Sequence, residues 1–192
     1  MNSMDIKEEI EKTVQTLKAG GLILYPTDTI WGIGCDASNE TAVQKLLQLK
    51  GRISDKGLIL LLDQPGRLAS FVRDVPATAW DLIEFSDKPL TIIYEGVYGV
   101  ADSVRASDGS VGIRITKNEF CQSLVEKLRK PIVSTSANIS GRPFATAFAD
   151  IEEEVKSGVD YIVNLRRDER TEMKPSTVLR LKINGQIEFI RS

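Results

Sequence analysis

The sequence changes abruptly from apolar to polar within LYPTDTIWGIGCDA, residues 24–37. An apolar run ends at Pro26, two threonines then flank Asp28, and glycines at 32 and 34 follow Trp31. Because proline has no backbone N–H to donate to a neighbouring strand, a buried strand is predicted to stop there. The hydroxyl groups that follow indicate either an ordinary turn or the floor of a small-molecule site.

Apolar periodicity on either side of this stretch predicts alternating strands and helices. Helices are predicted at 5–18, at about 38–49, at 64–86 with an interruption at Pro76, at 119–129 and at 148–156. Strands are predicted at 22–25, 58–62, 90–94, 111–116, 131–134 and 160–165, and a hairpin at 176–191 with a type I′ turn at Asn184-Gly185. This order predicts a single α/β domain over residues 1–192, with a twisted mixed sheet flanked by helices.

Composition excludes several classes of site. The chain has no histidine, so a Ser-His-Asp triad, a Cys-His pair and histidine zinc ligands are impossible. Its net charge of −2 argues against a general nucleic-acid binder. Cys35 and Cys121 fit no metal or redox spacing and are expected to be reduced, partly buried thiols. The acidic N-terminus and the lack of an apolar run near ~18 residues predict a cytoplasmic protein without a membrane helix.

The glycines of GIGCDA match the alanine-ended dinucleotide fingerprint, but their context does not. In that fingerprint the glycines lie directly between a strand and a helix. Here the polar PTDT segment precedes them, and the predicted helix cap Ser38-Asn39 follows. A dinucleotide-binding fold is therefore not expected.

Three further polar segments lie next to predicted strands. They are LKGRISDKG (49–57), with three cations, VSTSANISGRP (133–143), with hydroxyl and amide groups, and KPSTVL (174–179). Each alone is typical of a solvated turn or a helix cap. Together with PTDT they favour a site that neutralises a phosphate or carboxylate electrostatically, without covalent catalysis. RRDERTEMKP (166–175), with seven charges in ten residues, is predicted to be a mobile surface loop.

These segments in this order resemble the YrdC/TsaC family, the bacterial L-threonylcarbamoyladenylate synthases. The resemblance rests on YPTDTIWGIGCDA, LKGRISDKGLILLL, KPLTIIY, SVGIRIT, PIVSTSANISGRP and KPSTVL, which span residues 22–179. It implies a YrdC-like fold with a deep, positively lined concave groove. It also implies that L-threonine and bicarbonate form a carbamate, which attacks the α-phosphate of ATP. Pyrophosphate leaves, and the threonylcarbamoyl-AMP serves threonylcarbamoyladenosine modification of tRNA.

The resemblance also implies roles for individual residues. Lys50 and Arg52 match the family's Lys-x-Arg pair, and Ser136 and Asn138 match its Ser-x-Asn pair; these four are expected to be catalytic. The expected ATP-binding residues are Arg52, Lys56, Ser136, Ala137 and Asn138, and the expected threonine-binding residues are Thr29, Arg114, Thr135 and Ser176. Mg²⁺ is expected on the phosphates, with no metal site built from protein side chains. Transient contact with the proteins that transfer threonylcarbamoyl to tRNA is also implied.

Two positions depart from the family pattern, and two other functions stay open. Ile53 stands where the family often has proline, and Trp31 stands at its usual tyrosine. One alternative is a non-catalytic protein that holds an RNA backbone in the groove, against which the acidic balance and the 6% aromatic content count. The other is a family paralogue that acts on a different acid or amine. The complete Lys-x-Arg and Ser-x-Asn set favours the synthase.

Overall fold

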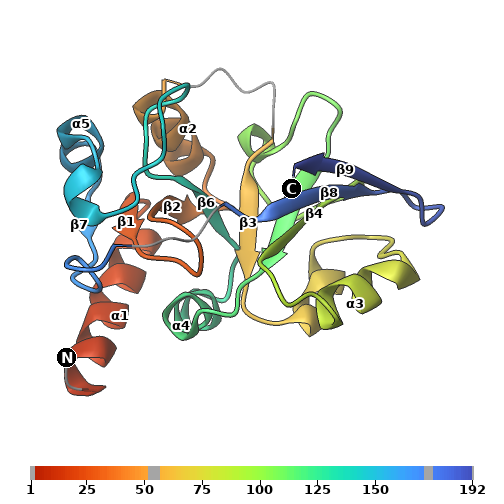
Figure 1. Cartoon of the computed structure of the whole chain (residues 1–192), viewed down its shortest axis with the longest axis horizontal. Coiled ribbons are helices and arrows are strands. Elements are labelled where there is room, and N and C mark those ends of the chain that lie inside the picture. The colour runs from red at the N-terminus through yellow and green to blue at the C-terminus, as the bar shows by residue number, and fades with distance from the viewer. Residues whose placement is uncertain (1–2, 52–56, 171–174, 192) are drawn as a thin grey trace.

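The computed structural model describes residues 3–51, 57–170 and 175–191, which form a nine-stranded mixed sheet flanked by helices (Figure 1). The strands lie in the order β7-β1-β2-β6-β3-β5-β4-β8-β9. Their bounds are β1 Ile23–Tyr25, β2 Gly32–Asp36, β3 Ile59–Leu62, β4 Leu90–Tyr94, β5 Val111–Ile115, β6 Ile132–Ser136, β7 Tyr161–Ile162, β8 Thr177–Leu181 and β9 Ile187–Arg191.

Helices pack on both faces of this sheet. They are α1 Ser3–Lys18, α2 Glu40–Leu49, α3 Ala77–Glu84, α4 Glu119–Leu128 and α5 Glu153–Ser157, with 3₁₀ turns at Pro65–Ser70, Asp102–Val104 and Phe148–Asp150. Successive residues of a strand point to opposite faces. Tyr25 and Ile132 accordingly belong to the hydrophobic cluster that includes α1 and α4, whereas their neighbours Leu24 and Val133 belong to the cluster that includes α2 and α3. The sheet is therefore buried on both faces along its central strands.

Most predicted elements are confirmed, with local differences. The predicted α/β class and its twisted mixed sheet are both present. Pro76 does interrupt the 64–86 segment: it caps α3, and the chain before it forms only a 3₁₀ turn. The predicted helix at 148–156 is divided into the 3₁₀ turn Phe148–Asp150 and α5, because Ile151 and Glu152 have extended backbone.

Strand β2 was not predicted from the sequence. It runs antiparallel to both β1 and β6, so residues 26–31 form the loop of a β1–β2 hairpin. Gly32 and Gly34 lie inside this strand, which confirms that they are not a dinucleotide fingerprint. A Cβ on Gly34 would lie 2.8 Å from the Val133 carbonyl oxygen and 2.9 Å from a ring carbon of Tyr25. Gly34 thus allows the neighbouring strands to pack closely. Because glycine has a low strand propensity, the sequence did not predict β2.

The predicted C-terminal hairpin is present, but the prediction of a type I′ turn is wrong. That turn needs positive φ at both central residues, and only Gly185 has it, with φ +84°. The Gly185 N–H donates to the Lys182 carbonyl oxygen, and the Lys182 N–H donates to that of Gln186. The loop therefore has three residues, with Gly185 in the left-handed conformation, and such loops are the next most common hairpin connection.

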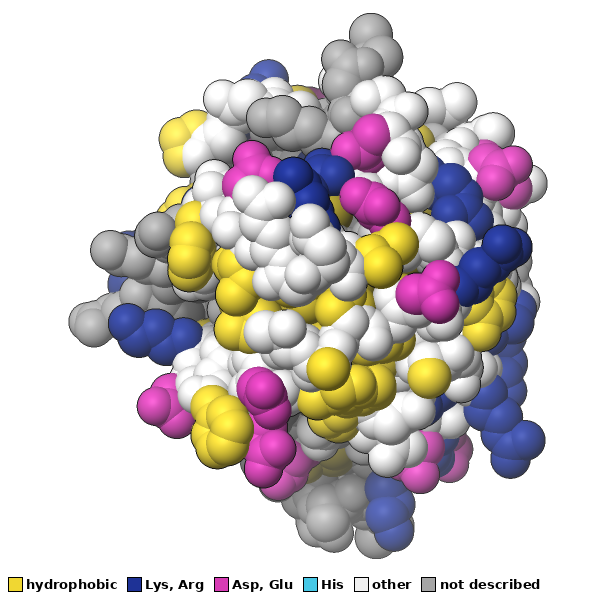
Figure 2. Space-filling view, turned by 90° about the vertical axis from the view of Figure 1, so that its right-hand side faces the viewer, with side chains coloured by type: hydrophobic (Ala, Val, Ile, Leu, Met, Phe, Trp, Pro, Cys, Tyr) yellow, Lys and Arg dark blue, Asp and Glu magenta, His cyan; other side chains and the backbone are white. Residues whose placement is uncertain are grey.

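One end of the molecule carries exposed hydrophobic side chains. Figure 2 views the end where α3 and the β8–β9 hairpin lie, and hydrophobic groups form a band across it. The exposed large hydrophobic residues of these segments are Trp80, Phe85, Ile183, Ile187, Phe189 and Ile190. No helix in the described part of the chain is long and apolar enough to cross a membrane.

Part of the charged 166–175 segment is anchored to the sheet. Arg166 Nη1 donates to the Thr27 carbonyl oxygen at 3.1 Å, and Arg167 Nη2 donates to that of Ile162 at 2.6 Å. Residues 171–174 lie outside the described residues. The predicted mobility of the loop therefore stays a prediction.

Candidate functional site

A cavity of about 240 Å³ lies where polar side chains of β5, β6, β9, the β1–β2 loop and the residues just before β8 come together. The charged side chains that line it, within the described ranges, are Arg114, Arg142 and Arg191, and no carboxylate lines it there. Hydroxyl groups supply much of the remaining polar lining: Thr27, Thr29, Ser134, Thr135, Ser136 and Ser176. Such a surface attracts an anion and offers hydrogen bonds to it.

The β1–β2 loop presents two buried threonines to this cavity. Thr27 Oγ1 donates to the Ile30 carbonyl oxygen at 2.8 Å and accepts the Thr29 N–H at 3.0 Å. The two hydroxyl oxygens are also 3.0 Å apart. A hydroxyl has one hydrogen to donate, and that of Thr27 is used on Ile30. We therefore infer that the Thr29 hydroxyl donates to Thr27 Oγ1. The lone pairs of Thr29 Oγ1 then serve as acceptors.

Arg114 of β5 reaches the same loop. Its neighbours Ile113 and Ile115 face the opposite side of the sheet, where they line a second cavity. Arg114 Nη1 donates to Thr29 Oγ1 at 3.2 Å, and Arg114 Nη2 lies 3.2 Å from Asp28 Oδ1. Its Nε has no hydrogen-bond partner among the described residues. A guanidinium has five N–H donors, so several donors stay available to an anion in the cavity.

Lys50 holds the end of β6 and the segment after it through hydrogen bonds. Lys50 is 3% exposed, and its ammonium donates to the carbonyl oxygens of Ser136 at 2.6 Å and Asn138 at 2.5 Å, and to Asn138 Oδ1 at 3.2 Å. The Asn138 amide nitrogen in turn donates to the Arg142 carbonyl oxygen at 2.6 Å. The Ala137 N–H donates to the Trp31 carbonyl oxygen at 2.9 Å. These contacts fix the end of β6, where Ser136 lies, and the loop after it, which carries Asn138.

Ser176 and Arg191 form the opposite wall. Ser176 Oγ lies 2.8 Å from Thr91 Oγ1, and the Ser176 carbonyl oxygen accepts from Arg191 Nε at 3.2 Å and Nη2 at 2.9 Å. Burial, and then the positive charge of Arg114, lower the pKa of Arg191. Both guanidinium groups line the same cavity, so their positive charges repel each other when no anion is bound between them.

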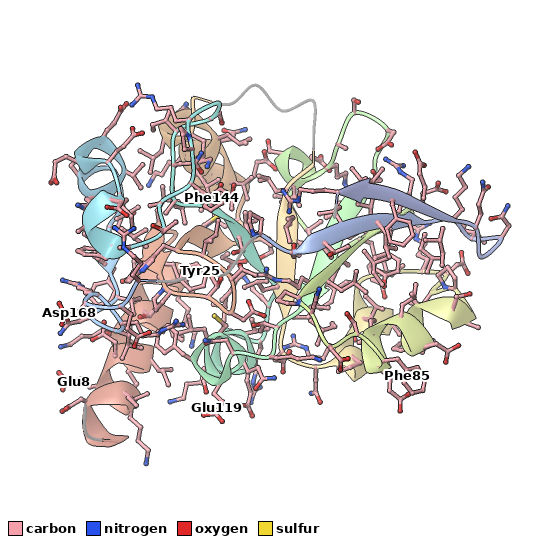
Figure 3. All side chains as sticks on the ribbon, viewed as in Figure 1. Glu8, Tyr25, Phe85, Glu119, Phe144 and Asp168 are labelled. Atoms are coloured by element: carbon pink, nitrogen blue, oxygen red, sulfur yellow. The ribbon has the colours of Figure 1, made fainter. Side chains whose placement is uncertain are left out.

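Aromatic rings complete the cavity wall. Trp31, 5% exposed, packs against Phe148 with ring centroids 5.1 Å apart. The tryptophan that stands at the family's usual tyrosine is therefore held by apolar packing. Phe144, 40% exposed, lines the cavity from the loop after β6 (Figure 3). Tyr25, also labelled in Figure 3, donates its hydroxyl to Ser134 Oγ at 2.8 Å and so supports the floor.

The structure brings most of the predicted site residues together. The predicted residues that line the cavity are Thr29, Arg114, Thr135, Ser136, Asn138 and Ser176. Lys50 and Ala137 lie behind this lining, and Arg52, Ile53 and Lys56 lie outside the described residues. Sequence reasoning missed Arg142 and Arg191, although Arg142 lies within the quoted VSTSANISGRP segment and could have been selected for its charge.

Other titratable groups supply no second centre. Within the described ranges, no three Asp, Glu or Cys side chains are grouped closely enough to hold a metal ion. Cys35 and Cys121 are free and buried, as expected. Burial raises the pKa of the Cys121 thiol to about 12, and it raises the pKa of the Cys35 thiol as well. Neither thiol is poised to act as a nucleophile.

Comparison with known proteins places this chain in a family. Threonylcarbamoyl-AMP synthase from Hahella chejuensis is 39% identical to this chain over 155 residues, which are 79% of this chain and 83% of that protein. The enzyme of the same name from Idiomarina loihiensis is 36% identical over 148 residues, 75% of this chain and 79% of that protein.

Solved structures agree in fold. P. abyssi Sua5 complexed with L-threonine matches 90% of this chain at 28% identity, with a TM-score of 0.82. The match spans half (50%) of that longer chain. E. coli YciO matches 95% of this chain and 88% of its own at 23% identity, with a TM-score of 0.82, which shows the shared fold. The Sua5/YciO/YrdC family model, described as telomere recombination, matches residues 15–192, and the chain therefore belongs to this family.

Proposed function

We propose that this protein is an L-threonylcarbamoyladenylate synthase that acts in the cytoplasm. The observation that carries the proposal is the cavity lined by three arginines and six hydroxyl residues, with no carboxylate among the described lining residues. Threonine carboxylate, carbamate and nucleotide phosphates are all anions. Relatives with this activity in their names match most of the chain. The product would serve threonylcarbamoyladenosine modification of tRNA.

The threonine end of the cavity would be built around Arg114. Its available N–H donors would bind the substrate carboxylate, with the hydroxyls of Thr29, Thr135 and Ser176 beside it. Charge-assisted bonds from a guanidinium to a carboxylate are strong and directional. Arg191, which the sequence did not single out, would add positive charge at the same end.

The nucleotide end would be the loop after β6. Ser136 and Asn138 line the cavity there, and Arg142 adds a cation. Lys50 has its ammonium directed at Ser136 and Asn138, so in this arrangement it would act by holding the loop. Arg52 and Lys56, from the neighbouring segment, would supply further charge to the phosphates.

The reaction needs two successive bond-forming steps. The threonine amine attacks bicarbonate carbon, and water leaves, which gives the carbamate. A carbamate oxygen then attacks the α-phosphorus of ATP, and the bond to pyrophosphate breaks. The arginines would stabilise the developing negative charge and position the two reactants. Because the described lining has no carboxylate, Mg²⁺ would arrive on the triphosphate as part of the nucleotide substrate.

The experiment is pyrophosphate release from ATP and Mg²⁺, with L-threonine and bicarbonate each present or omitted. Release that requires both supports the synthase. Release that requires another amine or acid would overturn the proposal in favour of a paralogue. No release, together with RNA binding that weakens steeply with salt, would instead favour the RNA-binding alternative.

A further inference from the structure

Asp28 contacts the predicted threonine-binding arginine from outside the site cavity. It lies between Thr27 and Thr29 in the β1–β2 loop, and its Oδ1 is 3.2 Å from Arg114 Nη2. Arg114 is buried and Asp28 is largely buried, with 6% and 14% of their side chains exposed. Asp28 Oδ1 makes no hydrogen bond within the described part of the chain, so its attraction to Arg114 is electrostatic.

The two sides of this ion pair face different cavities. Arg114 lines the 240 Å³ cavity that holds the proposed substrate site. Asp28 lines a second cavity of about 670 Å³, which Ile113 and Ile115 also line from the opposite face of β5. The carboxylate therefore approaches the guanidinium from behind. It can influence Arg114 while it leaves the substrate side of the cavity free.

The contacts of Arg114 define the orientation of its guanidinium plane. Nη1 is fixed by the Thr29 hydroxyl, and Nη2 is attracted by Asp28. The Asp28 carboxylate is itself near the Lys117 backbone N–H, 3.5 Å from Oδ2. Among the described residues, Asp28 is the carboxylate that pairs with Arg114. A buried cation that loses such a counter-charge is strongly disfavoured and tends to move. Loss of Asp28 is thus expected to disturb Arg114 even though every substrate contact residue is retained.

Asp28 also adjusts the charge at this end of the cavity. Arg114 and Arg191 line the same cavity, so two cations share this end of it. Together with one carboxylate they leave one net positive charge, which matches the single carboxylate of an amino acid. Without Asp28 the same end would carry two positive charges and would attract a phosphate dianion more strongly.

We propose that Asp28 is a positioning residue that orients Arg114 and limits its charge, so that this end of the cavity selects a monocarboxylate over phosphate. The proposal rests on the synthase function proposed above. It assigns Asp28 no contact with substrate. Its effect is therefore expected on threonine affinity and anion selectivity, and not on nucleotide affinity.

The test compares Asp28→Asn with Asp63→Asn. Asp63 is a matched control, because it forms a similarly buried ion pair with Arg67 at 3.1 Å and lines the same larger cavity. In Asp28→Asn we expect the KM for threonine to rise about tenfold or more, with kcat and the KM for ATP within about twofold. Inorganic phosphate, competing with threonine, should inhibit this variant about tenfold more strongly. Asp63→Asn should change none of these values.

Calorimetric titration with threonine separates this proposal from the synthase proposal. If the wild type binds threonine without releasing pyrophosphate, the synthase function fails, and the Asp28 comparison still proceeds on binding alone. An unchanged threonine affinity in Asp28→Asn, or an equal loss in Asp63→Asn, would overturn the positioning role. Should Asp28→Asn fail to fold, Asp28→Glu keeps the charge but displaces it by one methylene. A raised threonine KM with unchanged KM for ATP then supports the proposal, and unchanged kinetics refute it.

Discussion

Replacement of Thr29 by valine tests the predicted threonine end of the cavity most directly. Valine keeps the shape of the side chain but removes the oxygen that accepts from Arg114 Nη1 at 3.2 Å. It also removes the partner of Thr27 Oγ1 at 3.0 Å. A hydrogen bond to a charged group contributes about 1.5–3 kcal/mol. If threonine binding is weakened by the full energy of this hydrogen bond, the KM for threonine rises about 10- to 150-fold.

The assay is threonine-dependent pyrophosphate release at saturating ATP and bicarbonate. Thr13→Val is the matched control, because the Thr13 hydroxyl is fully buried and donates to the Glu9 carbonyl oxygen at 2.7 Å in α1, remote from the cavity. The control should lose some thermal stability and keep its KM for threonine. A KM for Thr29→Val within twofold of the wild type would refute the assignment of Thr29 to the substrate site.

Three further predictions concern stability and reactivity. Gly34→Ala places a Cβ under 3.0 Å from two groups and should cost about 1–3 kcal/mol in chemical denaturation, whereas Gly66→Ala, with nothing within 4 Å, should be nearly neutral. The thiols of Cys35 and Cys121 should react with Ellman's reagent only after unfolding, because burial raises the pKa of both; rapid labelling of the native protein would contradict this. The hydrogen bond from the Ser110 hydroxyl is the main cause that lowers the pKa of Asp108 from 3.8 to about 2. Asp108 should therefore stabilise the fold above pH ~4 and lose that effect towards pH 2, and Asp108→Asn should flatten this part of the stability profile.

The sequence predicted the fold best where periodicity is strong. The apolar faces of α1, α2 and α4 and the runs of β3 and β4 follow directly from residue spacing. Strand β2 was not predicted because GIGCD combines two glycines with a polar end. Its pairing also depends on β6, which lies far along the chain. The hairpin turn was mistaken because Asn-Gly fits both a two-residue and a three-residue loop, and only backbone geometry distinguishes them.

Prediction of the candidate site had a similar limit. The polar segments after β1 and β6 and before β8 all reach one cavity, as their hydroxyl content suggested. Arg191 was missed because an arginine at the end of a strand has no sequence feature that separates it from a solvated one. Asp28 was quoted only as part of the PTDT motif. Its proposed positioning role depends on the side from which it contacts Arg114. That side can be recognised only when the positions of both cavities are known.

The strand order of the sheet also governs when the cavity can exist during folding. Gly32 of β2 pairs with Ser136 of β6, about 100 residues later, and Leu90 of β4 pairs with Thr177 of β8. Contacts this distant in sequence form slowly, because long loops must close first. A partly synthesised chain therefore has no complete cavity in which to hold a substrate. Substrates would bind only the finished sheet, and they would raise its melting temperature in proportion to the logarithm of their concentration.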